Sequence, residues 1–462
     1  MATDSTPDPA TLSAIFKAYD VRGVVPDQLD DDLAGAVGNA FATVTDAAVS
    51  GIVVGHDMRP SSPGMARAFA EGAAETGADV HLIGLASTDE LYFASGKLGL
   101  PGAMFTASHN PAHYNGIKLC RAHAVPVGLD TGLTEIRDRV ASGERTSAPS
   151  PGTIDEVDVL EDYAEYLRKL APVTGRRLRV AVDAGNGMAG HTAPAVLGPL
   201  DLDLLPMYFE LDGTFPNHEA NPIDPENLRD LQAKVTDSGA DAGLAFDGDA
   251  DRCFVVDERG QVVSPSVLTA LIAARELRRE PGAKVIHNLI TSKAVPEIVT
   301  ELGGVPVRTR VGHSFIKATM ADSGAIFGGE HSGHFYFRDF WRADSGMLAA
   351  LHVLAALAET NRPLSSLLAD YSRFVASGEI NSTVDDQGGV VTRVEDAFRG
   401  REGVELDHLD GLTVTSPRWW FNVRPSNTEP LLRLNVEADD EPTMVAVRDE
   451  ALGIIRASGP GS

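Results

Sequence analysis

The chain is poor in cysteine: Cys120 and Cys253 are the only two among its 462 residues. They supply no disulfide framework, so we expect a protein of a reducing compartment, the cytoplasm. Apolar runs are short, since none approaches the roughly 20 residues of a membrane-spanning helix. Residues 1–10 are polar and lack the basic and apolar regions of a signal peptide. The sequence therefore predicts a cytoplasmic protein that does not span a membrane.

Positive charge is scarce as well. The chain has 39 lysines and arginines against 66 acidic residues, which gives a formal net charge of -27. An acidic surface repels nucleic acid and anionic membranes, so we expect neither as a partner. We expect a small-molecule partner and a monomer or homodimer. An anionic substrate would require a site that gathers its own local cations.

Apolar and amphipathic stretches alternate along most of the chain, which predicts an α/β fold with a largely parallel first sheet. The length suggests about three or four domains. A proline-rich stretch at 147–152 predicts a linker, and Thr153 and Glu156 have the spacing of a capping box at a helix start. The predicted strands are 51–55, 80–83, 103–106, 179–183, 284–287 and 305–307, and the predicted helices are 61–76, 91–98 and 346–360.

The last part of the chain has a different pattern. Apolar runs predict strands at 419–423 and 431–436, joined by a turn, and a final helix at 441–455. These elements predict a small α+β domain.

An acidic loop is the most informative stretch of the sequence. Asp247, Asp249 and Asp251 alternate with small residues, and apolar runs at 243–246 and 253–256 predict a strand on each side. Carboxylates this close repel each other unless a positive charge lies between them, and a hard divalent cation takes oxygen ligands. The loop therefore predicts a metal site.

A calcium-binding EF-hand is one alternative for the acidic loop. The three aspartates and Glu258 fall at positions 1, 3, 5 and 12 of such a loop. Position 6 requires glycine because the backbone turns sharply there, and here it is Arg252. The flanks are also predicted as strands and not helices. A solvated acidic turn is a second alternative, which the flanking apolar runs disfavour.

A second candidate site is the loop from Thr106 to Pro111, which carries Ser108 just after a predicted strand. Ligand and catalytic loops lie at such strand ends in open α/β sheets. His109 is a potential base, but adjacent side chains usually diverge, so a Ser-His hydrolase dyad is the weaker interpretation. Nearby, Lys118 is either a surface lysine or a desolvated group that moves protons.

A third polar loop spans residues 328–334. Glu330, Ser332 and His334 alternate there with glycines and a histidine. The loop could present a carboxylate and a hydroxyl to sugar hydroxyls, or it is an ordinary glycine-rich turn.

A fourth loop spans residues 424–430. Arg424 supplies a planar fork of donors, and Ser426, Asn427 and Thr428 add the donors of a phosphate nest. The alternative is a hairpin turn rich in turn-forming residues.

Together and in this order, the four loops resemble those of the α-D-phosphohexomutase superfamily, most closely its phosphomannomutase/phosphoglucomutase branch. The resemblance runs from Tyr19-Asp-Val-Arg-Gly23 to the Arg424 loop. It implies three related α/β domains with mixed sheets and a smaller C-terminal α+β domain around a central cleft. We expect these domains at 1–146, 150–257, 258–370 and 371–462.

The resemblance also implies a role for each matching residue. One oxygen of the phosphoserine would complete the shell of a single Mg²⁺, and two of the catalytic residues, the lysine and the histidine, are candidates for proton transfer. By position these are the phosphoserine Ser108; the magnesium ligands Asp247, Asp249 and Asp251, which Ser108 completes; the sugar-binding Glu330, Ser332 and His334; the phosphate-binding Arg424, Ser426, Asn427 and Thr428; and the catalytic Ser108, Arg22, Lys118, Arg252 and His313, with Arg252 beside the metal site.

The implied activity interconverts mannose 6-phosphate and mannose 1-phosphate, with glucose phosphates as further substrates to test. It uses a phosphoserine and a hexose 1,6-bisphosphate intermediate, which also acts as activator. Phosphoglucomutase and phosphoglucosamine mutase are the nearest alternatives. From other classes, a magnesium-dependent sugar phosphatase and a calcium-binding or scaffold protein without turnover stay open.

Three segments depart from the general pattern of the superfamily. Ser87-Thr-Asp89 stands where many members have Thr-Pro. A third-domain lysine has no clear match, and Lys293 is only near its position. The segment Phe340–Ala343 is outside the pattern, and it either lines a cleft or packs locally.

Overall fold

The computed structural model describes residues 8–426 and 431–457 and divides into two compact units. The first unit contains the residues up to Pro265 together with Met320–Phe327 and Ser332–Leu367. The second contains Ser266–Thr319, Gly328–His331 and the residues from Leu368 onward. None of the helices in the described residues is long and apolar enough to cross a membrane.

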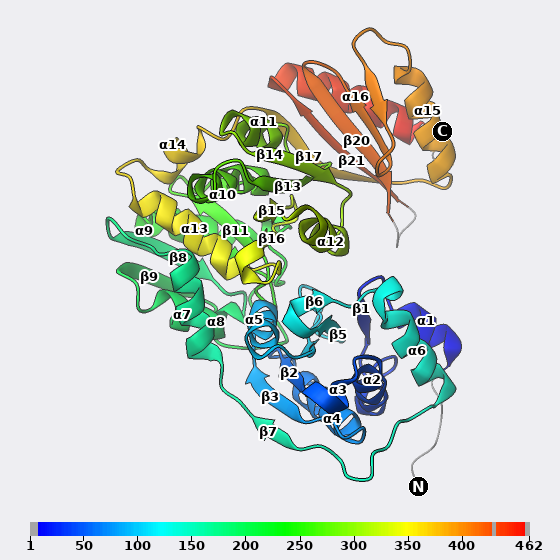
Figure 1. Cartoon of the computed structure of the whole chain (residues 1–462). Helices are drawn as coiled ribbons and strands as arrows, with labels where there is room; N and C mark the ends of the chain where they lie inside the picture. The colour runs from blue at the N-terminus through cyan, green and yellow to red at the C-terminus, as the bar shows by residue number, and fades with distance from the viewer. Residues whose placement is uncertain (1–7, 427–430, 458–462) are drawn as a thin grey trace. The chain divides into compact units, whose positions relative to one another are not determined.

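The first unit begins with a mixed sheet of order β1-β5-β4-β2-β3-β7, in which β6 also pairs with β5 (Figure 1). β2 is parallel to β3 and β4, but β5 is antiparallel to β1, β4 and β6. Because β7 is also parallel to β3, six of the seven strands run in one direction and only β5 is reversed, so the sheet is mixed but largely parallel, as predicted. Its strands are β1 (Asp20–Val24), β2 (Ile52–His56), β3 (Val80–Leu85), β4 (Gly102–Phe105), β5 (Tyr114–Arg121), β6 (Val125–Pro126) and β7 (Ile154–Glu156).

Closely packed helices cover this sheet. A Cβ added at Gly38 would lie 2.1 Å from the Phe69 carbonyl oxygen, and one at Gly72 would lie 2.0 Å from that of Gly35. Only glycine permits this approach of α2 to α4. The helices are α1 (Pro9–Ile15), α2 (Asp31–Val44), α3 (Ala47–Ser50), α4 (Ser62–Ala74), α5 (Thr88–Leu98) and α6 (Leu133–Ser142), with 3-10 turns η1 (Ala122–Ala124) and η2 (Leu129–Thr131).

A second sheet of the first unit has the order β12-β11-β10-β8-β9. β8 is parallel to β9 and β10, and β10 forms an antiparallel hairpin with β11. Its elements are β8 (Leu178–Asp183), β9 (Leu202–Met207), β10 (Ala242–Phe246), β11 (Cys253–Asp257), β12 (Val262–Val263), α7 (Leu160–Leu170), α8 (Ala189–Leu197), η3 (Pro225–Leu228) and α9 (Arg229–Ser238).

The third sheet has the order β14-β13-β15-β16, with β13 parallel to β14. The division between the units falls within α12 and β15. The elements are α10 (Pro265–Arg279), β13 (Lys284–Asn288), α11 (Ala294–Glu301), β14 (Val305–Thr309), α12 (His313–Ser323), β15 (Phe327–Gly329), β16 (Phe335–Phe337), η4 (Arg338–Phe340), α13 (Gly346–Ala358) and α14 (Leu364–Leu368).

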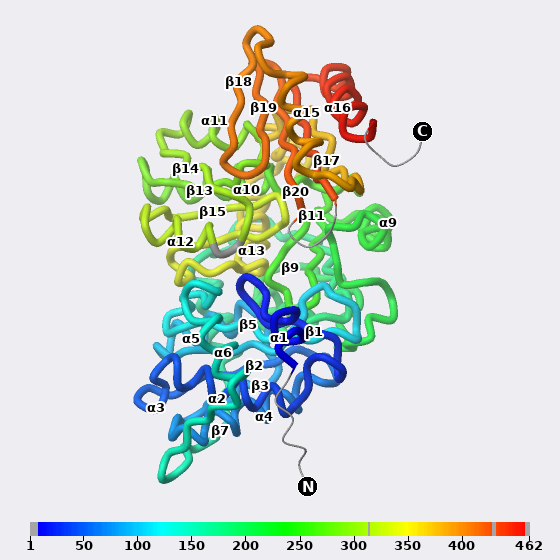
Figure 2. The backbone as a smooth tube through the Cα atoms, turned by 90° about the vertical axis from the view of Figure 1, so that its right-hand side faces the viewer, coloured from blue at the N-terminus to red at the C-terminus, as the bar shows by residue number. Residues whose placement is uncertain are grey.

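The second unit ends in an antiparallel sheet of order β17-β21-β20-β19-β18, whose strands β18, β19 and β20 run side by side in Figure 2. Phe398 packs edge-on against Phe421 at 4.8 Å between ring centroids, which joins a helix to the sheet. The predicted α+β domain is observed. Its elements are β17 (Val375–Thr383), α15 (Gln387–Phe398), β18 (Glu405–Asp407), β19 (Leu412–Thr415), β20 (Trp419–Pro425), β21 (Leu431–Ala438) and α16 (Glu441–Arg456).

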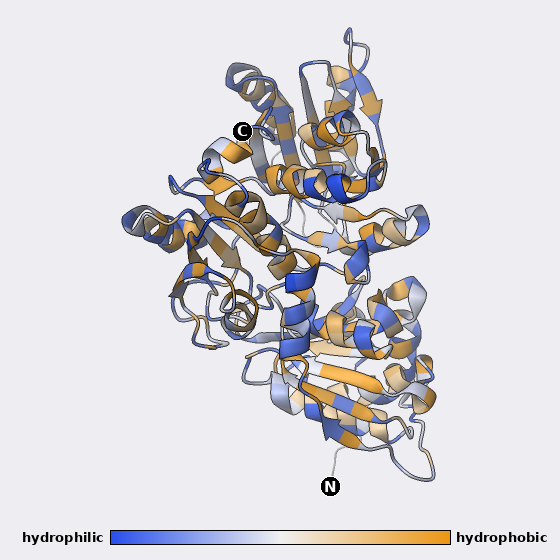
Figure 3. Cartoon of the chain, turned by 60° about the vertical axis from the view of Figure 1, so that its left-hand side comes forward, coloured by the Kyte–Doolittle hydropathy of each residue, from blue (hydrophilic) through white to orange (hydrophobic). Residues whose placement is uncertain are grey.

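Hydrophobic residues are concentrated in the strands, as Figure 3 shows for the sheet nearest the N-terminus.

Two local predictions are wrong. Residues 154–156 form strand β7 against β3, so the predicted helix begins at Leu160, as α7, and not at Thr153. Helix α5 starts at Thr88 and not at Leu91, because the Ser87 hydroxyl accepts from the Glu90 N–H at 3.2 Å. Ser87 and Glu90 have capping-box spacing, a signal that the prediction missed.

Candidate active site

The acidic loop is the turn of the β10–β11 hairpin, with Phe246 paired to Cys253. Asp247, Asp249 and Asp251 are at most 1% exposed. The observed strands on both sides support the strand-loop-strand prediction and contradict an EF-hand, which needs helices. Their burial also excludes a solvated turn.

A half-buried lysine and a buried arginine partly neutralise these carboxylates. Lys118 Nζ lies 2.7 Å from Asp249 Oδ2 and 2.7 Å from Asp251 Oδ2, and Arg252 Nη2 lies 2.7 Å from Asp247 Oδ2. Burial and the neighbouring carboxylates raise the pKa of Asp247 to about 7 against the opposing effect of Arg252. Burial alone would raise the pKa of Asp249 too, but the Lys118 ammonium and several hydrogen bonds lower it.

The loop could hold a metal ion. One ligand oxygen from each aspartate lies within 4.8 Å of the others. Asp249 Oδ1 and Asp251 Oδ1 are buried and have no hydrogen-bond partner among the described residues. Buried oxygens of this kind require an explanation, and an ion is one of the few available. The residues therefore fit the predicted cation site.

Ser108 lies directly against this loop. Its Oγ donates to Asp247 Oδ2 at 2.7 Å, although the two residues are far apart in sequence. Its backbone has the left-handed conformation, with φ of 49°, which favours glycine and costs on the order of 1 kcal/mol for other residues. A Cβ at Gly248 would lie 2.4 Å from the Ser108 carbonyl oxygen, so only glycine lets the two loops meet.

A buried arginine that the sequence analysis missed holds the serine loop. Arg59 is 1% exposed, and its guanidinium donates to the carbonyl oxygens of Ser108 at 2.8 Å and Asn110 at 2.7 Å. It also donates to Pro111 O and to Tyr114 O, each at 2.9 Å. The segment Asp57-Met-Arg59 follows a predicted strand, and that position was the available signal.

The side chains of His109 and Ser108 were predicted to diverge, but in the structure they lie close together. His109 Nδ1 lies 3.2 Å from Ser108 Oγ, but Arg252 Nη2 lies 2.6 Å from the same nitrogen. Burial and the Arg252 charge hold the pKa of His109 well below its usual value. The imidazole is therefore neutral with its acceptor nitrogen directed to Arg252, which still argues against a hydrolase dyad.

Arg22 and Lys118 lie on the paired strands β1 and β5, where Asp20 is opposite Lys118. Arg22 donates to Asp20 Oδ2 and to Asn110 Oδ1, each at 2.6 Å, so it reaches the serine loop. Burial opposes the charge of Lys118, but Asp249 and Asp251 raise its pKa well above the usual value. Lys118 is therefore protonated and is not a surface lysine.

The predicted sugar-binding loop contributes to both units. In the second unit, Glu330 is 3% exposed and accepts from Asn288 Nδ2 at 3.3 Å and the Gly312 N–H at 3.4 Å. In the first unit, Ser332 Oγ lies 3.1 Å from His334 Nδ1. His334 Nε2 lies 3.7 Å from Asp251 Oδ1, which places this histidine beside the acidic loop.

Arg424 of the predicted phosphate loop lies at the end of β20, opposite Arg433 on β21. Both guanidinium groups pair with Glu379, at 3.1 and 3.2 Å, and the Nε atoms of both have no hydrogen-bond partner among the described residues. His331 Nε2 lies 3.9 Å from the same carboxylate. Arg433 was missed, although its place across the predicted hairpin was a usable signal.

Some predicted residues carry less structural information. Ser426 continues the hairpin through a backbone bond to the Leu431 carbonyl at 2.9 Å. Asn427 and Thr428 lie outside the described residues, as does the side chain of His313, which begins α12. Lys293 donates its backbone N–H to Glu437 at 2.9 Å, a contact within the second unit that indicates a structural role.

The departing segment Phe340–Ala343 packs locally within the first unit. Phe340 is fully buried, and Trp341 stacks on Tyr166 of α7 with ring centroids 5.2 Å apart. A Cβ at Gly96 of α5 would lie 2.1 Å from the Trp341 ring. The segment thus connects α5 and α7.

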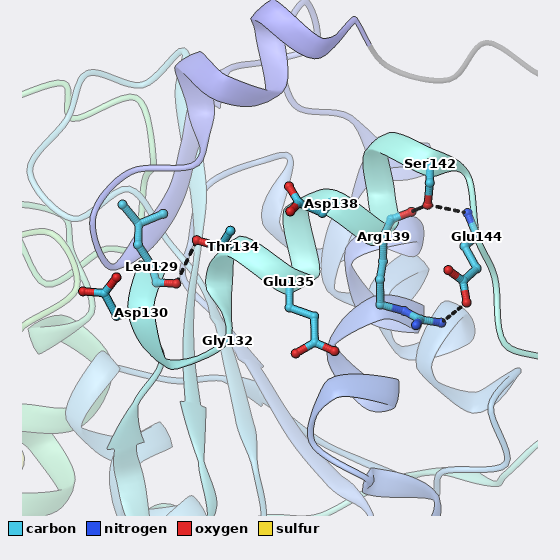
Figure 4. Close-up of a pocket in the computed structure, with 9 residues that line it drawn as sticks. All are labelled: Leu129, Asp130, Gly132, Thr134, Glu135, Asp138, Arg139, Ser142 and Glu144. Atoms are coloured by element: carbon cyan, nitrogen blue, oxygen red, sulfur yellow. Dashed lines mark hydrogen bonds and ion pairs between the residues drawn. The ribbon is translucent and has the colours of Figure 1, made fainter.

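A separate surface pocket of about 540 Å³ lies over η2 and α6 (Figure 4). Four of its side chains are acidic, and its arginine, Arg139, pairs with Glu144 at 3.2 Å. None of the predicted site residues lines this pocket, so it is distinct from the candidate active site. Its lining residues are Leu129, Asp130, Gly132, Thr134, Glu135, Asp138, Arg139, Ser142 and Glu144.

Comparisons with known proteins identify the family of the chain. Sequence models of the family described as phosphoglucomutase/phosphomannomutase match its alpha/beta/alpha domains I, II and III at residues 13–147, 161–260 and 265–374, and its C-terminal domain at 379–454. The chain therefore belongs to the phosphoglucomutase/phosphomannomutase family of α-D-phosphohexomutases. This confirms the predicted superfamily and its α/β fold class.

Individual relatives span nearly the whole chain. Phosphohexose mutases of Xanthomonas campestris pv. campestris are 42% identical over 450 residues, covering 96% of this chain and 98% of the relative. A phosphomannomutase of Escherichia coli is 39% identical over 459 residues, covering 96% and 100%. A solved phosphoglucomutase/phosphomannomutase family protein from Burkholderia thailandensis has a TM-score of 0.88 at 32% identity, covering 97% of this chain and 98% of that one.

Proposed function

We propose that the protein is a phosphomannomutase that interconverts mannose 6-phosphate and mannose 1-phosphate through a phosphorylated Ser108. The observation that carries the proposal is the 2.7 Å contact between Ser108 Oγ and Asp247 in the buried acidic loop. The phosphomannomutase of Escherichia coli, 39% identical over 459 residues, supports the choice of mannose. The chemistry is an intramolecular phosphoryl transfer, an isomerisation.

The reaction runs in two halves. In the first, a hydroxyl oxygen of the hexose monophosphate forms a bond to the phosphorus on Ser108. The bond from phosphorus to Ser108 Oγ breaks, and the hydroxyl proton passes to a base. The product is a hexose 1,6-bisphosphate, which also serves as activator. After reorientation, Ser108 Oγ takes the phosphoryl group from the other end, and the base returns the proton.

Charge neutralisation and positioning supply most of the rate enhancement in such transfers. The three aspartates and one phosphoserine oxygen would hold one Mg²⁺, which when bound offsets negative charge on the phosphoryl group. Arg252 lies 3.5 Å from Ser108 Oγ and is placed to stabilise the same charge. Arg22 and Lys118 supply the local cations that an anionic substrate needs on this acidic chain.

The remaining roles concern proton transfer and substrate recognition. Lys118 and His313 are the two candidates for proton transfer, and Lys118 rests in its protonated form because Asp249 and Asp251 raise its pKa against the effect of burial. Glu330, Ser332 and His334 bind sugar hydroxyls. The group that binds the phosphate not being transferred is Arg424, Ser426, Asn427 and Thr428.

The substrate choice is tested by comparing turnover of three sugar phosphates. We expect kcat/KM for mannose 1-phosphate to equal or exceed that for glucose 1-phosphate, and both to exceed that for glucosamine 1-phosphate. A clear preference for the amino sugar would replace mannose in the proposal. Rapid release of inorganic phosphate without isomerisation would favour a sugar phosphatase.

We also propose four domains at 1–146, 150–257, 258–370 and 371–462, which the ranges of the family matches support. A cytoplasmic location is supported by the two cysteines, which are both free and buried. A monomer or homodimer is the proposed state, and light scattering distinguishes the two.

A further inference from the structure

The start of helix α5 holds the acidic loop at two points. Thr88 is its first residue and is fully buried. Its Oγ1 donates to Asp249 Oδ2 at 2.5 Å, and its backbone N–H donates to the Asp249 carbonyl oxygen at 3.0 Å. Asp249 Oδ1 has no hydrogen-bond partner among the described residues. Thr88 therefore fixes one carboxylate oxygen and leaves the other available for a ligand.

Asp89, the next residue, fixes the helix start itself. Its Oδ1 accepts from Ser87 Oγ at 2.5 Å, and its Oδ2 accepts from Tyr163 OH at 2.8 Å and Ser345 Oγ at 2.6 Å. Tyr163 belongs to α7, and Ser345 caps α13. All four residues are fully buried, so water does not compete for these bonds. The position of Thr88 is thus set through Asp89 by two segments that are distant in sequence, α7 and the start of α13.

The ring packing described above adds to this arrangement. Trp341 fills the space beside Gly96, and its ring centroid lies 6.0 Å from that of Phe93 on the same helix. Close-packed rings resist displacement, because a shift of α5 would open a cavity or force a clash. The start of α5 is therefore a rigid support for the acidic loop.

We propose that Thr88 is a positioning residue for Asp249 and that Asp89 acts one step further out by fixing Thr88. The inference rests on the proposed metal site. A donor bonded to a ligating carboxylate sets its orientation, and loss of such a partner costs about 10–100-fold in metal affinity or activity. Thr88 and Asp89 both lie in the segment Ser87-Thr-Asp89, which departs from the general pattern of the superfamily.

The test measures Mn²⁺ affinity directly by EPR titration of the full chain without substrate. Thr88→Val removes the hydroxyl and keeps the side-chain shape, whereas Thr88→Ser keeps the hydroxyl. Thr192→Val is the matched control: Thr192 is equally buried, and its Oγ1 donates to the Met188 carbonyl oxygen at 3.3 Å inside α8. Should Thr88→Val fail to fold by circular dichroism, Thr88→Ala replaces it.

We expect Thr88→Val to weaken Mn²⁺ binding by about 10–100-fold, Thr88→Ser to retain affinity near that of the unsubstituted protein, and Thr192→Val to change nothing. Asp89→Asn should weaken binding by a smaller factor. Unchanged affinity in Thr88→Val, or an equal loss in Thr88→Ser, would overturn the inference. Absence of Mn²⁺ binding by the unsubstituted protein would instead overturn the proposed metal site, so the two failures are distinguishable.

Discussion

In the first unit three buried aspartates face two cations, Lys118 and Arg252, whereas in the second unit two arginines face one carboxylate, Glu379. The first arrangement has an excess of negative charge and the second an excess of positive charge. One suits a metal cation and the other a phosphate anion. A net charge of -27 thus conceals local imbalances of both signs.

The aspartates of the first unit and the arginines of the second unit also differ in the elements that fix their positions. The aspartates lie on a hairpin turn that is supported from α5, β5 and the serine loop. The arginines lie opposite each other on the paired strands β20 and β21. Contacts from several elements fix the positions of side chains as closely as a chemical reaction requires, whereas one hairpin is sufficient to bind a charged group.

The largest expected effect is loss of activity when divalent cations are removed. Treatment with EDTA should lower kcat by about 1000-fold or more, because a bound metal contributes several kcal/mol to such a transition state. Added Mg²⁺ should restore it. Calorimetric binding of mannose 1-phosphate should persist without the metal, since the arginines of the second unit need none. Full activity in EDTA would contradict the claim that the excess negative charge of the first unit serves a metal cation.

A smaller effect is expected in the second unit. Arg424→Ala and Arg433→Ala should each raise KM by about 10–100-fold, because a charge-assisted hydrogen bond contributes about 1.5–3 kcal/mol. Arg418→Ala is the control, since Arg418 is exposed and pairs with Asp439 and Asp440. Unchanged KM in both test variants would contradict the proposed anion site. It would not bear on the proposed metal site.

The sequence predicted those parts of the fold and site that depend on short-range pattern. The acidic loop between apolar strands, the serine loop and the C-terminal hairpin were predicted, and the structure places Ser108 against Asp247. Thr88, Arg59 and Arg433 were missed because their roles come from contacts far along the chain. Thr88, for example, meets Asp249 only after two sheets have formed.

Wrong local predictions have a similar origin. Residues 154–156 pair with β3 as an edge strand, and this tertiary pairing overrides a capping pattern that Thr153 and Glu156 share with many helix starts. His109 was expected to diverge from Ser108, but the left-handed backbone at Ser108 turns the two side chains toward each other.

A third expected effect concerns stability and its pH dependence in the first unit and does not involve the chemical step. Burial and the charge of Asp89 raise the pKa of Glu90 to about 8, and its Oε2 has no hydrogen-bond partner among the described residues. The folded state then binds a proton more tightly than the unfolded state does. This group therefore makes stability fall as pH rises from about 4.5 to about 8.

Glu90→Gln removes that dependence. Urea unfolding measures the difference in free energy of unfolding between Glu90→Gln and the unsubstituted protein. This difference should increase in favour of the variant by a few kcal/mol from pH 5 to pH 8. Glu135→Gln, an exposed change on α6, should leave the curve unaltered. If the relative stability of Glu90→Gln instead increased as the pH was lowered, the sign would be reversed. That result would contradict the burial of an uncompensated carboxyl group in this unit.

The central claim is that Ser108 carries the phosphoryl group. The most direct measurement is intact-mass spectrometry with site mapping after incubation with a hexose 1,6-bisphosphate, on the unsubstituted protein and on Ser108→Ala. We predict one phosphoryl group on Ser108, its transfer to added mannose 1-phosphate, and a loss of mutase activity of about 1000-fold or more in the folded variant. Mutase activity without phosphate on Ser108, or full activity in Ser108→Ala, would contradict the account.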